Sequence, residues 1–439
     1  MIRTVDLRGQ SLDKAGYQSL LPRATLDVAQ AMVAIEPILK RVREGSEADL
    51  IALAQEFDGV TPATIRVPQS ALDAALTQLD PAIRTALEVS AARIRTVHND
   101  QIRTDSKTTV VDGGVVTEKW IPVDRVGLYV PGGRAVYPSS VMMNVIPAQI
   151  AKVQSIAVAS PPQSEFGGLP HPTILATCEL LGVTEVYAIG GAQAIALFAY
   201  GMKDLCEKCD LVTGPGNIYV AAAKRALRGI IGIDSEAGPT EIAIVADESA
   251  IAADVAADLI SQAEHDTIAA AILVTDSQEL ATAVEKELAL RVPRTKHSER
   301  ITTALGGIQS AIVLVDSVAQ GLDVVNAYAA EHLEIQTVDA QLVASKIRNA
   351  GAVFIGRFSP VYLGDYSAGS NHVLPTGGGA KYTSGLSVGR FLKPVTYQTS
   401  TRESTMQVAP HNSAIAGFEG MSAHKATADL RIELLNAGK

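Results

Sequence analysis

The chain has 439 residues, of which 47% are hydrophobic and 19% charged, and its formal net charge is −10. This length exceeds one ordinary hydrophobic core and predicts two large domains with smaller additional pieces. An acidic surface repels phosphate backbones and anionic lipid, and aromatic residues at 4% are too few for base-stacking platforms, so neither nucleic acid nor a membrane is an expected partner.

The N-terminal residues and the cysteines bear on location. The first ten residues, MIRTVDLRGQ, do not form the apolar core of a secretory signal. No run approaches 18 uninterrupted apolar residues, so no transmembrane helix is predicted. Three cysteines in a chain of this length do not make a disulfide framework, and a cytoplasmic location is expected.

The chain begins with an arm of weak periodicity, followed by helical patterns. Apolar residues recur with helical spacing from about Leu26 to Glu56 and again from Pro81 to about Asp105. Pro81 suits the first turn of a helix, because its missing N–H would have no partner there.

From Val126 onward, short β-branched runs alternate with Ala-rich helical stretches. The first series predicts strands at 155–160, 185–189 and 211–213, with helices at 172–181, 192–200 and 217–228. The second series predicts strands at 241–245, 271–275, 311–315, 333–336 and 352–355, with helices that include 250–263 and 278–290. This rhythm predicts two doubly wound α/β domains with parallel sheets. A β segment at 395–400 and a last helix after Ser422 predict a small C-terminal domain.

Three glycine-rich turns lie near the ends of strands in this pattern. They read GLYVPGGRAVYP (127–138), GGAQA (190–194) and GPGN (214–217). Glycines at such places let backbone N–H groups approach a phosphate at a helix N-terminus. The chain has no G-x-G-x-x-G, the usual dinucleotide fingerprint, and on pattern alone plain βα turns are the favoured interpretation.

A few polar residues have the donor atoms that zinc prefers. Gln262 and His265 are three positions apart near the end of a predicted helix, which places them on one face. Asp365 lies in a glycine-rich loop, and His424 follows Glu419 by five residues. Imidazole, carboxylate and amide oxygen together suit zinc. Without HExxH or paired CxxC motifs, a surface or capping role for each histidine remains the alternative.

Two pairs of residues close in sequence raise further hypotheses. Glu331 and His332 lie where a predicted helix gives way to a strand and could transfer protons, although His332 could equally favour the dipole at a helix C-terminus. Cys206 and Cys209 form a single CxxC motif, and without a second pair we interpret it as incidental. We predict that neither cysteine binds a metal or acts as a nucleophile.

Eight segments, in this order, resemble those of the histidinol dehydrogenase family. They are GLYVPGGRAVYPSSVMMNVIPA (127–148), AIGGAQAIA (188–196), TGPGNIYV (213–220), DSEAGPTEI (234–242), DLISQAEHD (258–266), NAYAAEHLEI (326–335), GDYSAGSNHVLPT (364–376) and EGMSAHK (419–425). The resemblance runs over nearly the whole chain, and the joint occurrence of the segments is far more specific than any single motif.

The resemblance implies an activity and an organisation. It implies oxidation of L-histidinol through L-histidinal to L-histidine, the last step of histidine biosynthesis, with two NAD⁺ reduced and one zinc ion per subunit. It implies two incomplete Rossmann-like domains, one formed by 25–125 with 240–385 and carrying the metal and acid–base residues, the other formed by 126–239 and binding NAD. An arm at 1–24 and a C-terminal domain at 386–439 complete the chain, and the latter reaches the partner's active site in a homodimer.

The resemblance also assigns individual residues. The implied zinc ligands are Gln262, His265, Asp365 and His424. The implied acid–base pair is Glu331 and His332, and the implied NAD contacts are Tyr129, Gln193 and Asn217. The implied substrate-binding set is Thr240, Glu419, His332 and the four zinc ligands. Thr240 departs from the serine that is usual in the family, but it keeps the hydroxyl that can form a hydrogen bond to the substrate.

Three alternatives stay open at this point. The same fold could act on another small alcohol or diol, although the carboxylates of Glu331 and Glu419 favour an amino alcohol whose ammonium they can pair. A metallohydrolase could use Glu331 to activate water without NAD. A non-catalytic NAD-binding regulator would not need the metal and base residues.

Overall fold

A computed structural model covers the chain and describes every residue except 1, 22, 25–27, 133–134, 237 and 439. It divides into a core unit, Met1–Gln101 with Asp124–Arg390, and a tail unit, Ile102–Val123 with Phe391–Lys439. Leu26, where the first helical pattern was expected to begin, lies outside the described residues, as do residues 133–134 and 237 of two segments that carry the family resemblance.

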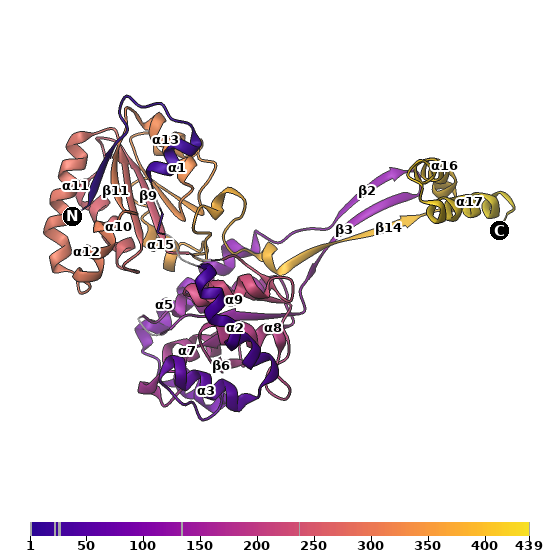
Figure 1. Cartoon of the computed structure of the whole chain (residues 1–439), viewed down its shortest axis with the longest axis horizontal. Helices are drawn as coiled ribbons and strands as arrows, with labels where there is room; N and C mark the ends of the chain where they lie inside the picture. The colour runs from indigo at the N-terminus through magenta and orange to yellow at the C-terminus, as the bar shows by residue number, and fades with distance from the viewer. Residues whose placement is uncertain (1, 22, 25–27, 133–134, 237, 439) are drawn as a thin grey trace. The chain divides into compact units, whose positions relative to one another are not determined.

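Sheet A of the core unit has six parallel strands (Figure 1). Their order is β1 (Arg3–Asp6), β11 (Ala311–Leu314), β10 (Ala270–Thr275), β9 (Glu241–Ala246), β12 (His332–Gln336) and β13 (Ala352–Ile355). Alternate side chains point to opposite faces of a strand. Ile242 and Ile244 therefore pack with α10 (Ala252–Ala263), α11 (Gln278–Arg291) and α12 (Ser298–Gly306). Ala243 and Val245 pack with α1 (Lys14–Leu20), α13 (Val318–Tyr328) and α14 (Ala340–Ala344).

Sheet B has five parallel strands that are almost entirely buried. Their order is β6 (Val186–Ala188), β5 (Ser155–Ser160), β4 (Arg125–Tyr129), β7 (Leu211–Thr213) and β8 (Gly232–Ile233). The connecting helices are α6 (Pro138–Ile150), α7 (Pro172–Leu180), α8 (Gly191–Tyr200) and α9 (Ile218–Leu227). Strands buried on both faces explain why the sequence here shows continuous apolar runs rather than alternation.

The two sheets share one topology. Counted along the chain from β4 and from β9, each has the strand order 3-2-1-4-5, and β1 is added at the edge of sheet A. This is the order of the Rossmann fold, in which the switch point lies between the first and fourth strands. The expectation of two doubly wound α/β domains with parallel sheets is confirmed.

The N-terminal helices pack differently from the prediction. They are α2 (Val28–Glu44), α3 (Glu47–Asp58), α4 (Gln69–Gln78) and α5 (Pro81–Asn99). Helix α2 packs on α8 and α9, α4 packs on α7, and α5 packs on α6, so all three contact helices of sheet B. Assigning residues 25–125 to the domain of residues 240–385 was therefore wrong, because an amphipathic pattern does not say which surface covers its apolar face. The predicted N-terminal arm instead supplies β1 and α1 to sheet A.

The tail unit is a three-stranded antiparallel sheet followed by a helical hairpin. β3 (Gly114–Pro122) lies between β2 (Ser106–Val111) and β14 (Leu392–Ser400), and α16 (Arg402–Phe418) packs against α17 (Ser422–Asn436). The small C-terminal domain thus begins at Phe391 rather than 386 and includes residues 102–123. The sequence analysis missed α16, which contains Pro410 and buries only Ser404, Ala409 and Ser413.

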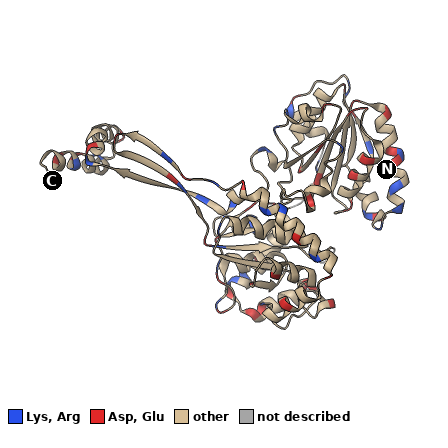
Figure 2. Ribbon diagram, turned by 180° about the vertical axis from the view of Figure 1, so that it is seen from behind, with Lys and Arg blue, Asp and Glu red and all other residues tan. Residues whose placement is uncertain are grey.

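Charged residues are distributed rather than clustered. Figure 2 shows Lys and Arg interspersed with Asp and Glu along the helices, while the strands of sheets A and B carry few charges. Among the described residues, no helix has both the length and the apolar character needed to cross a membrane.

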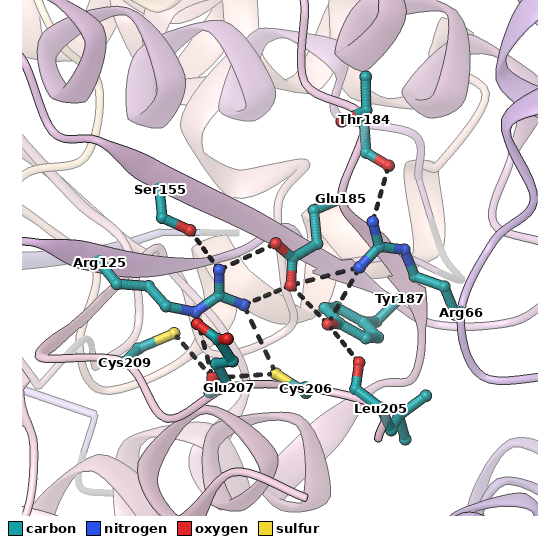
Figure 3. Close-up of polar contacts among 10 residues, drawn as sticks. All are labelled: Arg66, Arg125, Ser155, Thr184, Glu185, Tyr187, Leu205, Cys206, Glu207 and Cys209. Carbon is teal, nitrogen blue, oxygen red and sulfur yellow. Dashed lines mark hydrogen bonds and ion pairs between the residues drawn. The ribbon is translucent and has the colours of Figure 1, made fainter. Parts of the chain in front are cut away.

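A buried network braces the amino-terminal edge of sheet B (Figure 3). The Arg125 guanidinium, at the start of β4, pairs with both carboxylate oxygens of Glu185 just before β6. The same guanidinium donates to the C=O of Glu207, which lies in the segment before β7, at 3.2 Å. Ligands of doubly wound sheets bind at the opposite, carboxyl-terminal edge. The position of this network therefore points to a structural role.

Cys206 and Cys209 belong to this network. Both are buried, both contact the C=O of Glu207, and burial raises the pKa of each thiol. A protonated, buried thiol is a poor metal ligand and a poor nucleophile. That neither cysteine takes part in chemistry stays a prediction, and their burial supports it.

Arg125→Met should lower thermal stability much more than Arg66→Met. The side chains of Arg125 and Glu185 are 9% and 19% exposed, so the first change leaves Glu185 largely buried without its main partner, at a cost of about 3–5 kcal/mol. Arg66 also pairs with Glu185 but is 40% exposed, and its removal should cost about 1 kcal/mol or less. Thermal midpoints by circular dichroism measure the difference, and equal losses would contradict a brace centred on Arg125.

Candidate active site

A cavity of about 530 Å³ in the core unit gathers most of the predicted catalytic residues. Its lining comes from the turns after β4 and β7 in sheet B, from the residues just before β9 and β12 in sheet A, and from α15 (Val361–Tyr366) with the loop that follows. We call it the central cavity. Its polar lining residues include Ser140, Asn217, Thr240, His265, Glu331, His332, Asp365 and His372.

One residue at the start of β9 holds both members of the predicted acid–base pair. The N–H of Glu241 donates to Glu331 Oε2 at 3.0 Å, and the C=O of Glu241 lies 3.1 Å from His332 Nδ1. Strands β9 and β12 are parallel neighbours with Ile242 beside His332, so the register of sheet A brings the pair to this backbone. The chain reaches Glu331 from α13 through Ala329, whose φ of 56° is uncommon for a residue with a side chain.

The hydrogen bond at Nδ1 fixes the protonation of His332. A carbonyl oxygen only accepts hydrogen bonds, so Nδ1 carries the proton and Nε2 has the free lone pair. Nε2 is buried and has no hydrogen-bond partner among the described residues. Burial lowers the pKa of His332, although the carboxylate of Asp365 opposes this. His332 is therefore neutral at neutral pH, with Nε2 available to accept a proton.

Glu331 has an environment suited to a general base. Its side chain is buried, and burial raises its pKa to about 7, while the hydrogen bonds from Thr240 and the Glu241 N–H oppose the shift. A carboxyl group with a pKa near the working pH can both accept and return a proton.

Thr240 links Glu331 to Gln262. Its hydroxyl donates to Glu331 Oε2 at 2.5 Å and lies 2.5 Å from Gln262 Nε2. The single hydroxyl proton of Thr240 is donated to the carboxylate, so the hydroxyl oxygen must accept the hydrogen bond from Gln262. The Gln262 amide therefore donates through Nε2. The oxygen Oε1 of Gln262 is then the atom left for another ligand.

His265 and Asp365 line the central cavity with different polar atoms. Burial raises the pKa of Asp365 to about 6 and lowers that of His265, and Asp365 Oδ1 lies 3.9 Å from His332 Nε2. Outside the few residues that the structure leaves undescribed, no group of three or more His, Cys, Asp or Glu side chains could hold a metal. The predicted zinc set has only two members of these residue types in the core unit.

His372 is a half-buried residue of this site that the sequence analysis did not single out. Its Nδ1 lies 3.0 Å from the C=O of Asp365, and its Nε2 lies 3.1 Å from the Ser140 hydroxyl at the start of α6. Burial lowers the pKa of His372 to about 4, so the ring stays neutral. His372 thus fixes the α15 segment that carries Asp365. Its place seven residues after Asp365, inside a segment shared with the family, was the available signal.

The three predicted NAD contacts line a second cavity, of about 680 Å³, which we call the nucleotide cavity. Tyr129 ends β4, and its hydroxyl accepts a hydrogen bond from the Gly191 N–H at 3.2 Å. Gln193 is a buried residue of α8. Asn217 caps the N-terminus of α9, where its Oδ1 accepts from Tyr219 N–H at 3.0 Å. Asn217 and Gly132 line both cavities, so the two spaces adjoin.

A buried ion pair fixes the GPGN turn between the cavities. Lys224 Nζ lies 2.5 Å from Asp234 Oδ1 and donates to the Gly214 C=O at 2.6 Å, while Asp234 Oδ2 accepts from the Gly214 N–H at 2.8 Å. Gly214 has φ of 113°, and a Cβ there would lie 1.9 Å from the backbone oxygen of Tyr129. Only glycine fits this position.

Glu419 and His424, also predicted site residues, belong to the tail unit. Both are exposed and line a cavity of about 560 Å³ formed by residues of that unit. The core unit thus brings together Thr240, Gln262, His265, Glu331, His332 and Asp365, and these two residues are described with the tail unit.

Known proteins resemble the chain along its whole length. The family model described as histidinol dehydrogenase matches residues 21–432. The chain belongs to the histidinol dehydrogenase family. The histidinol dehydrogenase of Thermobifida fusca (strain YX) is 63% identical over 98% of both chains, and that of Streptomyces avermitilis is 60% identical over the same shares. A crystal structure of histidinol dehydrogenase from Elizabethkingia anophelis covers 99% of both chains with a TM-score of 0.92 and 30% identity.

Family membership decides between the alternatives that the sequence left open. The histidinol dehydrogenase family consists of NAD-dependent oxidoreductases, so the metallohydrolase and the non-catalytic regulator are not favoured. It also accounts for two Rossmann-ordered sheets without the usual glycine fingerprint.

Thr240→Val should move the acid limb of the dehydrogenase pH profile to higher pH by about one to two units. The hydroxyl is one of the groups that lower the pKa of Glu331, and a hydrogen bond to a charged group contributes about 1.5–3 kcal/mol. Thr240→Ser keeps the hydroxyl and is the matched control, so its limb should stay near that of the parent. Initial rates between pH 5 and 10 measure both, and an unmoved limb in the valine variant would show that Thr240 does not tune Glu331.

Proposed function

We propose that the chain oxidises L-histidinol to L-histidine in two successive NAD⁺-dependent steps, as the last step of histidine biosynthesis. The observation that carries the proposal is the pair Glu331 and His332, held on the Glu241 backbone in a cavity that adjoins the nucleotide cavity. Each of the two oxidations releases protons, and this pair offers two groups that can accept them.

NAD⁺ fits the nucleotide cavity and its border with the central cavity. The N-terminus of α9, capped by Asn217, lies in the lining of this cavity, and the positive end of a helix dipole favours phosphate. Tyr129 and Gln193 would hold the dinucleotide from the other side of the cavity. When bound, NAD⁺ supplies the hydride acceptor.

Zinc fits the donor atoms of the central cavity. The acceptor oxygen of Gln262 is left free by the Thr240 hydrogen bond, and His265 and Asp365 add a nitrogen and an oxygen donor. We assign the fourth ligand to His424 of a second subunit, because four ligands are usual for zinc. When bound, the ion supplies positioning and charge stabilisation for the polar groups of the substrate.

In the first half-reaction His332 accepts the hydroxyl proton of the substrate. His332 lines the central cavity, its Nε2 has no hydrogen-bond partner among the described residues, and Nδ1 is fixed by Glu241, so the ring is oriented before the substrate enters. The bond between carbon and hydrogen breaks with transfer of a hydride, and the alcohol becomes an aldehyde. No water is consumed.

The second half-reaction needs a water molecule. Hydride can leave the aldehyde carbon only after water has added to form a tetrahedral hydrate. Glu331, with a pKa near 7, is assigned to take the proton of that water, and His332 again accepts the hydroxyl proton. The product is the carboxylic acid.

Exposed apolar side chains of the tail unit support a homodimer with shared sites. None of the described α17 side chains is buried, and Phe418 and Ile415 on α16 are 95% and 58% exposed. Exposed apolar side chains on two helices of a small unit are typical of a surface that a second subunit covers. Glu419 and His424 lie beside this surface and would contribute to the partner's site.

Wild-type enzyme should yield two NADH per limiting L-histidinol, and Glu331→Gln should slow the second oxidation selectively. Glutamine keeps shape and hydrogen bonding but cannot take a proton, so single-turnover NADH formation should fall by about 10²–10⁴ when started from L-histidinal and much less from L-histidinol. His332→Asn should slow both.

Two outcomes distinguish an error in the proposed function from an error in the role assigned to Glu331. No NADH from L-histidinol with the parent enzyme would refute the proposed function. Equal losses from both substrates in Glu331→Gln would leave the function intact but show that Glu331 orients His332 instead of activating water.

Co-expression of His265→Asn with His424→Asn should restore activity that neither variant has alone. If each site takes His424 from the partner, each mixed dimer has one intact site of two, so purified mixed dimers should have roughly half of the parent activity. Random mixing makes half of the dimers mixed, so the unfractionated mixture should have roughly a quarter. Tagged mixed dimers purified in tandem provide the measurement. Mixed dimers without activity would show that each site is built from one chain.

A further inference from the structure

Asp58 is a polar residue of the nucleotide cavity that the catalytic argument does not use. It is the last residue of α3 and lines the cavity together with Tyr129, Gln193 and Asn217. Its Oδ2 atom is buried and has no hydrogen-bond partner among the described residues. A buried carboxylate oxygen without a donor is costly to the fold, so its presence calls for a ligand that supplies one.

Two further features make the position unfavourable for stability alone. A carboxylate at a helix C-terminus opposes the helix dipole, which favours positive charge there. Burial raises the pKa of Asp58 to about 6, but the group is still ionised at neutral pH, so the negative charge remains in the cavity. No Lys or Arg is found among the described residues that line the cavity, whereas Glu165 adds a second carboxylate.

The arrangement of the two cavities decides which end of the dinucleotide meets Asp58. The hydride acceptor must lie beside His332 and Glu331, in the central cavity. The two cavities share Gly132 and Asn217 in their linings and are therefore neighbours, and Asp58 lines the nucleotide cavity but not the central cavity. The adenosine half of the dinucleotide therefore occupies the space around Asp58.

We propose that the Asp58 carboxylate accepts a hydrogen bond from the 2′-hydroxyl of the adenosine ribose and thereby selects NAD⁺ over NADP⁺, an inference that rests on the proposed NAD-dependent function. Acidic residues at nucleotide sites use the same chemistry in other Rossmann folds, where the carboxylate follows a strand of the sheet. Here it comes from a helix outside the β-α-β series. A 2′-phosphate would lose the hydrogen bond and place its charge against Asp58, with no Lys or Arg among the described lining residues to compensate.

Isothermal titration of the full-length enzyme at pH 8 tests the inference without turnover. The probes are NAD⁺, NADP⁺ and 2′-deoxy-NAD⁺. Asp58→Asn should bind NAD⁺ about tenfold more weakly, because a charge-assisted hydrogen bond is lost, while its affinity for NADP⁺ should not fall. The parent should lose a similar factor with 2′-deoxy-NAD⁺, and Asp58→Asn should lose little more, because the two changes remove one interaction.

Glu56→Gln is the matched control, since Glu56 lies on the same helix but is exposed and outside the cavity. It should bind all three probes as the parent does. A parent that binds no NAD⁺ would refute the proposed function itself. A parent that binds NAD⁺ with unchanged preference in Asp58→Asn would overturn only the role of Asp58. Equally weakened binding of NAD⁺ and NADP⁺ in Asp58→Asn would also overturn the proposed role, because such a result would show that Asp58 only supports the fold.

Discussion

The site depends on the backbone of Glu241 at the start of β9. The N–H of Glu241 donates a hydrogen bond to Glu331, and its C=O accepts one from His332. In the interior of a sheet the same two groups would form hydrogen bonds with neighbouring strands. The side chain of Glu241 is anchored by an ion pair with Arg23, so the backbone that orients the bases is itself held from the N-terminal segment. Because a parallel sheet fixes the register of β9 against β12, no independent element has to position the two bases.

The two sheets line the cavities with opposite edges. Sheet B offers the turns after β4 and β7, at its carboxyl-terminal edge, which is where ligands of doubly wound sheets bind. Sheet A offers residues that precede β9 and β12, at its amino-terminal edge, together with the end of α10 and the α15 segment. Partly buried polar contacts such as that between Ser140 and His372 hold these segments in one site.

The sequence predicted the strands and most helices because β-branched runs and helical spacing are local signals. It could not say that α2 covers α8 and α9, since an apolar face fits any apolar surface of suitable shape. Residues 102–123 were missed although β2 and β3 form a local antiparallel hairpin, whose Asp112–Gly113 turn was an available signal. Only the pairing of β3 with β14, more than 260 positions later, is non-local. At the site, family resemblance supplied the residues that are proposed to contact ligands. His372 and the Glu241 backbone contact those residues instead, and no sequence pattern marked their role.

The shared strand order suggests how such a site could originate. Two sheets with one strand order are what duplication of a Rossmann half would produce. In this chain sheet B lines the cavities with its carboxyl-terminal edge, whereas sheet A places Glu331 and His332 at its amino-terminal edge. Neither half contains the whole set of lining residues, so the two halves are expected to be inactive when expressed as separate modules.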